Sequence, residues 1–125
     1  MIRMRSKYGS RKVEFSGLRF DSQAEARRWG ELLILERMGK IGSLRRQVAL
    51  ELVPGVKLHG ARRARPAIRL IVDFSYRLPD GQLVYEDTKG FETPQSLLKR
   101  HLAKALHGID VRLTGFIAPS GYERG

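Results

Sequence analysis

The chain has 125 residues, the length of one domain, and contains no cysteine, which excludes a disulfide framework, a thiolate nucleophile and a cysteine-based zinc site. No apolar run approaches the roughly 20 residues that a membrane-spanning helix needs, so we expect a soluble protein without a membrane partner. Lys and Arg number 24 against 13 Asp and Glu, and the net charge of +11 favours a polyanionic partner over an inert basic surface.

The first predicted elements are a short hairpin and a helix. Residues 13–20 form two short strand-like segments around a Ser-Gly turn, which predicts a hairpin that closes a basic arm over residues 1–12. Ser22 followed by Glu25 has the capping-box pattern, so we expect a helix to begin here. Its apolar positions continue to about Met38, and the glycine that follows can end it.

Three strands are expected next. Segment 43–53 places its apolar residues on one face, which favours a strand, and segment 68–76 alternates apolar and polar residues with a clear period of two. Between them, the arginine-rich residues 62–65 are expected in a loop. Segment 83–89 is the third strand and follows the second one after a short turn.

The last predicted elements are a second helix and a strand. Thr93 is the expected N-cap, Pro94 occupies the first helical position, and Gly108 follows the last turn. The apolar stripe of this helix comprises Leu98, Leu102, Ala105 and Leu106. Segment 111–117 is the final strand. The order predicts an α+β or mixed α/β fold in one domain over residues 1–125, with a central mixed sheet flanked by helices.

The positive charge is concentrated in three groups of lysine and arginine. Such groups suit the phosphates of a nucleic acid, because neutralising phosphates releases condensed counterions. The residues are Arg3, Arg5, Lys7, Arg11 and Lys12 in the arm; Arg62, Arg63 and Arg65, with Lys57 and Arg69 nearby, between the first two long strands; and Lys99, Arg100 and Lys104 on the second helix.

The turn between the second and third long strands predicts which residues face one another. Residues 79–81, Pro-Asp-Gly, fit a three-residue hairpin loop with a left-handed glycine at its end. In that register Leu78 faces Gln82, and counting back along both strands places Asp73 opposite Asp87. A two-residue loop would instead move Asp87 to the other face, but the proline favours the longer loop.

Facing aspartates indicate a metal site. Backbones of opposed residues lie only about 5 Å apart, so two carboxylates there repel each other unless one is protonated or a cation lies between them. A hard divalent cation such as Mg²⁺, or Mn²⁺, prefers this oxygen-rich environment. Lys89 falls on the same face as Asp87, where it could pair with the carboxylates, orient a water nucleophile or contact a scissile phosphate.

Three further residues are candidates for the site. Glu25 is explained by the capping box alone, yet its direction on the helix is toward the face that packs on the sheet. Glu36 has the same direction, and the position of Glu25 beside the cap favours Glu25. Gln47 could reach the aspartates from the preceding strand. Glu86 falls on the opposite face from Asp87, and a solvated strand end explains it as well as a direct role does.

These residues resemble the PD-(D/E)XK nuclease superfamily. The matching elements are a helix with Glu25, a strand with Val72-Asp73, the next strand with Asp87-Thr88-Lys89, and a following helix. Almost the whole chain more closely resembles a phage- and prophage-associated family of small proteins. That likeness is carried by Lys7-Tyr8-Gly9, Phe20-Asp21-Ser22, Glu25-Ala26 and Glu86-Asp87-Thr88-Lys89-Gly90.

The resemblance implies a restriction-endonuclease-like αβββαβ core with Asp73 and Asp87 as metal ligands. It also implies that Glu25 helps to hold the metal and that Lys89 acts on the attacking water. Val72 stands where the superfamily motif has proline, and Asp87 stands where glutamate is commoner. Both departures leave the oxygen ligands in place.

The expected function is that of a Mg²⁺-dependent DNA endonuclease, selective for structure in branched replication or recombination intermediates. By analogy with phage relatives it would act in the cytoplasm of a bacterial host cell. The residues do not distinguish DNA from RNA, and a homodimer is expected if both strands of a duplex are cut. The alternative is a non-catalytic nucleic-acid-binding protein, for which the positive charge would suffice.

Overall fold

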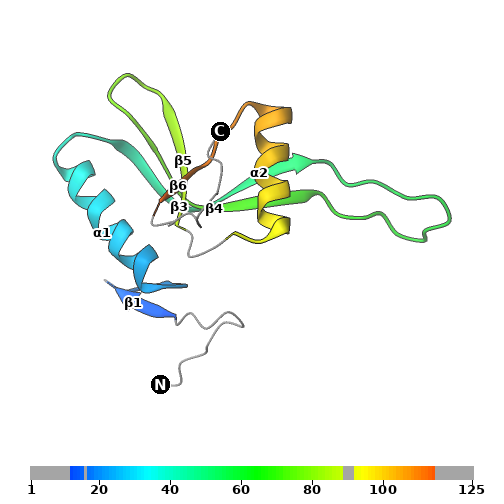
Figure 1. The fold of residues 1–125 in the computed structure, drawn as a ribbon, viewed down its shortest axis with the longest axis horizontal. Coiled ribbons are helices and arrows are strands. Elements are labelled where there is room, and N and C mark those ends of the chain that lie inside the picture. The colour runs from blue at the N-terminus through cyan, green and yellow to red at the C-terminus, as the bar shows by residue number, and fades with distance from the viewer. Residues whose placement is uncertain (1–11, 16, 89–91, 115–125) are drawn as a thin grey trace, which may run out of the picture. The chain divides into compact units, whose positions relative to one another are not determined.

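The computed structural model describes residues 12–15, 17–88 and 92–114 (Figure 1). The elements in chain order are β1 (Val13–Phe15), β2 (Leu18–Phe20), α1 (Gln23–Arg37), β3 (Gly42–Val53), β4 (Ile68–Arg77), β5 (Leu83–Thr88), α2 (Pro94–His107) and β6 (Arg112–Thr114). This order confirms the predicted α+β fold: an N-terminal hairpin followed by an αβββαβ core. Within the described ranges no helix is long and apolar enough to cross a membrane.

The strands form two sheets. β1 and β2 pair by themselves, while the larger mixed sheet has the order β3-β4-β5-β6. β5 and β6 run parallel, with Asp87 beside Leu113, and α2 forms the crossover that a parallel pair requires. The expected ends of two strands, Lys89 and residues 115–117, lie outside the described residues, as do Arg3, Arg5, Lys7 and Arg11.

One compact unit, Met1–Leu44 with Tyr76–Leu83, contains the N-terminal hairpin, α1 and the turn between β4 and β5. We call it the hairpin unit. Both hairpin strands contact α1. The buried ring of Phe20 packs between Phe15 and Trp29, with 6.5 Å between ring centroids in each pair. Aromatic packing of this kind fixes the hairpin against the first turns of α1.

The other compact unit, Arg45–Ser75 with Val84–Gly125, contains most of the large sheet together with α2 and β6. We call it the sheet unit. Its core is a single cluster of buried apolar side chains from β3, β4, α2 and the approach to β6. They are Val48, Leu52, Leu70, Val72, Ala103 and Val111. The alternation of buried and exposed residues along β3 and β4 agrees with the predicted period of two.

The predicted packing face of α2 is only partly right. Leu102 of the predicted stripe packs against the core of the sheet unit, but two other leucines of the stripe do not. Leu98 and Leu106, taken from the sequence as part of the apolar stripe, are 58% and 55% exposed. The helix instead buries Ala103, which is 0% exposed and lies about 140° around the helix from Leu98. The small side chain lets the helix backbone approach the sheet closely, whereas a face of leucines would hold it farther away.

Candidate functional site

The turn between β4 and β5 has the predicted geometry. The Gly81 N–H donates to the Leu78 carbonyl at 2.8 Å, and the Leu78 N–H donates to the Gln82 carbonyl at 2.9 Å. Gly81 has φ +89°, a left-handed conformation that glycine adopts without steric cost. These bonds define a three-residue loop with Leu78 facing Gln82, so the two-residue alternative is excluded.

In the sheet unit, Asp73 of β4 and Asp87 of β5 lie side by side, as that register requires. Asp87 Oδ1 accepts a hydrogen bond from the Asp73 N–H at 2.9 Å. In turn, Asp73 Oδ2 accepts from the Thr88 N–H at 2.8 Å. Each carboxylate therefore takes a backbone donor of the other strand. Asp87 is 4% exposed and Asp73 is half-buried, so the pair is largely withdrawn from solvent.

The two carboxylates have the chemistry of a hard-metal site. Bonds from backbone N–H groups orient both side chains and offset part of their mutual repulsion. A carboxylate has about four lone-pair sites, so an oxygen that accepts one N–H can still bind a cation. Among the described residues no group of three or more His, Asp and Glu side chains forms a metal cluster. Mg²⁺ nevertheless fits a two-carboxylate site, because it commonly completes its shell with water and phosphate oxygens.

Gln47 of β3 contacts Asp73 of this pair, as the sequence predicted. Its Nε2 donates to Asp73 Oδ1 at 3.4 Å. The backbone of Gln47 has φ +51°, a left-handed conformation that costs a residue with a side chain about 1 to 2 kcal/mol. Such a residue interrupts the regular pleat of a strand and redirects its side chain, and backbone strain of this kind is concentrated at functional sites. Ser43 of β3 has a similar φ of +52°, so it is the 3.4 Å contact that links Gln47 to Asp73.

Glu25 lies in the hairpin unit, in the first turn of α1. Its N–H donates to Oγ of the N-cap Ser22 at 3.1 Å, and its Oε1 accepts from the Asp21 N–H at 3.3 Å. The capping function predicted from the sequence is therefore present. Glu25 is nevertheless only 3% exposed, whereas Glu36 is exposed and accepts a hydrogen bond from the Leu44 N–H. The two glutamates have the same direction on the helix, but only Glu25 is buried.

Glu86 is not a solvated residue at the end of a strand. It is 1% exposed, and its Oε2 accepts a hydrogen bond from Thr114 Oγ1 at 3.2 Å. Because it precedes Asp87, it projects from the other face of β5. Its burial depends on β6, which comes beside β5 only after the α2 crossover, so the local sequence contains no sign of it.

The cations of α2 have acidic partners that flank the helix in sequence. Arg100 makes two hydrogen bonds of 2.6 Å to the carboxylate of Glu92, and these side chains are 17% and 8% exposed. Lys104 pairs with Asp110 at 2.8 Å on the surface. The helix contains no acid itself, but these ion pairs neutralise two of its three predicted phosphate-binding residues. The third, Lys99, is half-buried.

The other predicted phosphate-binding residues differ in their surroundings. Lys12 pairs with Asp21 at 2.6 Å in the hairpin unit. Arg62, Arg63 and Arg65 are exposed in the sheet unit. They form no ion pair with the other described residues, and such exposed guanidinium groups are the better candidates for binding phosphate.

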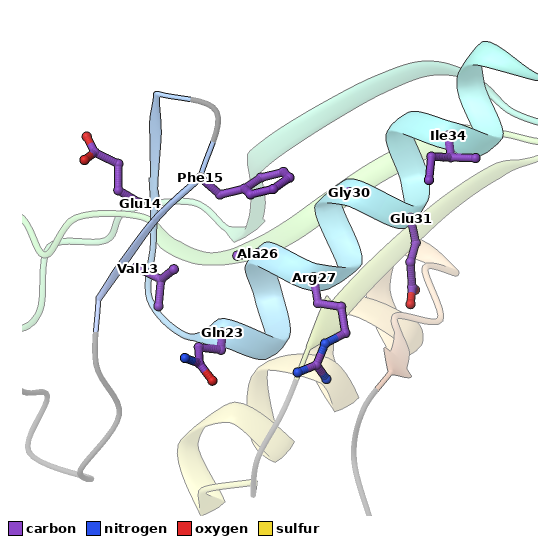
Figure 2. Close-up of a pocket in the computed structure, with 9 residues that line it drawn as sticks. All are labelled: Val13, Glu14, Phe15, Gln23, Ala26, Arg27, Gly30, Glu31 and Ile34. Carbon is purple, nitrogen blue, oxygen red and sulfur yellow. The ribbon is translucent and has the colours of Figure 1, made fainter.

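The hairpin unit also contains a cavity of about 360 Å³ between β1 and α1 (Figure 2). Figure 2 shows the ring of Phe15 lying over the helix beside Gly30, with Ile34 farther along the same helix and Arg27 and Glu31 at the edge. The apolar part of this lining suits side-chain packing better than it suits hydrolysis of a phosphodiester. The aspartate pair therefore remains the candidate site.

The fold and the site define an α+β protein with two adjacent carboxylates at the centre of a mixed sheet. The chain belongs to the family described as "Protein of unknown function (DUF1064)", whose sequence profile matches residues 5–123. No curated protein and no solved structure matches it.

Proposed function

We propose that the chain is a metal-dependent endonuclease of the PD-(D/E)XK type that hydrolyses phosphodiester bonds in DNA. The observation that carries this proposal is the pair of reciprocal hydrogen bonds between the Asp73 and Asp87 segments. They bring two carboxylates together in a largely buried position, where a purely structural protein would more simply place apolar or neutral residues.

The aspartate pair would hold Mg²⁺ or Mn²⁺. When bound, such an ion supplies Lewis-acid polarisation of a phosphoryl oxygen. In the reaction a water oxygen attacks phosphorus, one phosphorus–oxygen ester bond breaks, and the leaving oxygen gains a proton. Gln47 holds the orientation of Asp73 through its 3.4 Å contact. The resemblance also implies a metal-holding role for Glu25, and it implies that Lys89, which lies outside the described residues, orients the attacking water.

The proposed substrates are branched DNA intermediates of replication or recombination, in the cytoplasm of a bacterial host during a phage programme. These details rest on the resemblance rather than on the site. The exposed Arg62, Arg63 and Arg65 support a nucleic-acid substrate. A homodimer would be needed for cleavage of both strands of a duplex, since one small site cuts one strand at a time.

Incubation with supercoiled, single-stranded and four-way-junction DNA tests the proposal directly. Cutting should occur in Mg²⁺ or Mn²⁺ and should cease in EDTA. Asp73→Asn and Asp87→Asn keep the size of each side chain and an oxygen that can accept the N–H, and they should abolish cutting. Glu51→Gln is the matched control, because it neutralises an exposed carboxylate of β3 in the same unit. Its cutting rate should equal that of the unchanged chain.

A non-catalytic nucleic-acid-binding protein is the competing function, and the exposed arginines alone would support it. It predicts no metal-dependent cutting of any of the three DNA forms. The endonuclease proposal predicts that Asp73→Asn loses cutting while DNA binding is retained or tightened, because a negative charge is removed near the phosphates. Absence of cutting by the unchanged chain in both metals would overturn the proposal.

A further inference from the structure

Residues 54–67, which we call the 54–67 arm, join β3 to β4 and form a two-stranded ribbon in the sheet unit. The N–H of Val56 donates to the carbonyl of Arg65 at 3.0 Å, and the N–H of Arg65 donates back to the carbonyl of Val56. Figure 1 shows the arm, in green, continuing both strands away from the sheet and from α2 of the same unit. The arm is thus a paired projection that begins where the core of the sheet unit ends.

Close backbone packing holds the base and the tip of the arm. A Cβ placed on Gly55 would lie 2.6 Å from the Arg65 carbonyl oxygen, so only glycine lets the two sides approach this closely. At the tip, the Ala61 N–H donates to the Leu58 carbonyl at 3.0 Å and closes a turn. Leu58 is 57% exposed and Val56 is 50% exposed. The ribbon therefore presents apolar side chains at and near its end.

The charge of the arm is entirely positive. No acidic residue occurs between Glu51 and Asp73 in the sequence. The cations, all exposed, are Lys57, Arg62, Arg63 and Arg65. Within the described part of the chain these four side chains take part in no ion pair, unlike Arg100 and Lys104 of α2. Four unpaired cations on one projection form a surface complementary to a polyanion.

The dimensions of the ribbon decide which polyanion surface it fits. Paired strands lie about 5 Å apart, and their side chains project alternately from the two faces of the ribbon. The major groove of B-DNA, about 12 Å wide, admits such a ribbon, whereas the minor groove is only about 6 Å wide. From the Val56–Arg65 pair to the tip, three or four residues span about 12 Å, more than the groove depth of about 8.5 Å. The exposed arginines of the arm can then reach phosphates, while Leu58 meets base edges such as thymine methyl groups.

We propose that the 54–67 arm enters the major groove of duplex DNA and binds it independently of the metal site. The inference rests on the nucleic-acid part of the proposed function but not on cleavage. Binding by the arm supplies affinity and register on the duplex, while the aspartate pair of the same unit supplies the chemistry. The arm thereby defines a B-form duplex segment as part of the substrate.

The test measures binding of the full chain to a short fluorescent DNA duplex in EDTA, so that no cutting occurs. The slope of log Kobs against log salt is negative, and each lost phosphate contact reduces its magnitude by about 0.9. The triple variant Arg62→Ala, Arg63→Ala, Arg65→Ala should reduce the magnitude of the slope by about 2.7. The unchanged chain should therefore lose about 40-fold more affinity than the variant between about 50 and 200 mM salt. An unchanged slope would overturn the proposal.

The charge-matched control removes three exposed cations from the α1 region of the hairpin unit: Arg27→Ala, Arg37→Ala and Lys40→Ala. The magnitude of its slope should decrease by less than about 1, which is the effect of a single phosphate contact. If the magnitude decreased as much as in the arm variant, net charge rather than the arm would determine binding, and the proposal would be overturned. The arm positions are exposed, so the folded state should be retained in both variants.

Groove competition provides the second measurement. Methyl green, a major-groove ligand, should displace the chain from the duplex, and netropsin, a minor-groove ligand, should not. Duplex RNA should bind more weakly, because its major groove is too narrow and deep to admit the ribbon. Displacement by netropsin alone would overturn the groove assignment. If methyl green but not netropsin displaced a chain that never cuts DNA, the groove inference would hold and the endonuclease proposal would fail.

Discussion

Replacement of Asp87 separates the two roles of its carboxylate in the sheet. Asp87→Asn and Asp87→Ala both remove the negative charge, so both remove the repulsion with Asp73. Only the asparagine keeps an oxygen that can accept the Asp73 N–H, which the aspartate now accepts at 2.9 Å. The difference in unfolding free energy between the two variants therefore isolates that hydrogen bond, together with the packing of one amide group.

The expected magnitudes follow from the burial of the site. Asp87 is 4% exposed, so alanine leaves a donor without its partner away from solvent, which costs about 1 to 3 kcal/mol. Two unit charges about 5 Å apart repel by about 3 kcal/mol at an effective dielectric constant of about 20. Removal of this repulsion can raise the unfolding free energy of either variant by at most that amount. In EDTA we therefore expect Asp87→Asn to be at least as stable as the unchanged chain, and Asp87→Ala to be less stable than Asp87→Asn.

Thermal unfolding by circular dichroism in EDTA measures the difference. For a chain of this length 1 kcal/mol corresponds to roughly 4 °C in Tm, so the two variants should differ by about 4 to 12 °C. The same pair of substitutions at Asp110, which pairs with Lys104 on the surface, should differ by less than about 0.5 kcal/mol. Equal Tm values for Asp87→Asn and Asp87→Ala would refute the reasoning, because the Asp73 amide would not depend on the carboxylate.

Three further predictions concern the metal, the strained strand and the arm. Mg²⁺ at about ten times its Kd should stabilise the chain by about 1.4 kcal/mol in thermal unfolding, and the double variant Asp73→Asn, Asp87→Asn should show no such shift. Gln47→Gly should leave the free energy of unfolding in urea unchanged or raise it by up to about 1 kcal/mol, because glycine relieves the strain at φ +51°. The same variant should cut DNA more slowly, and a cutting rate equal to that of the unchanged chain would contradict the positioning role of Gln47. Gly55→Ala should destabilise the chain by about 1 to 3 kcal/mol in urea unfolding, because the new Cβ would meet the Arg65 carbonyl oxygen at 2.6 Å, and full stability would contradict the close approach.

The sequence by itself determined the elements and one register. The helix beginning at Ser22 and the helix capped by Thr93 both follow from a side-chain oxygen that accepts the N–H three residues later, a contact within one turn. The Pro-Asp-Gly turn determined in the same local way that Leu78 faces Gln82. That register, continued along both strands, places Asp73 beside Asp87. These features were predictable because their energetics depend on neighbours in the chain.

The tertiary structure alone decided which faces and charges are buried. It placed Ala103 against the core of the sheet and left Leu98 and Leu106 of the predicted stripe exposed. It also covered Glu86 through Thr114, which belongs to a strand reached only after a crossover. It also neutralised Arg100 with Glu92, although the helix itself contains no acid. Periodicity shows that a face is apolar, but burial depends on contacts between segments far apart in the chain, and their close packing is not encoded in any single segment.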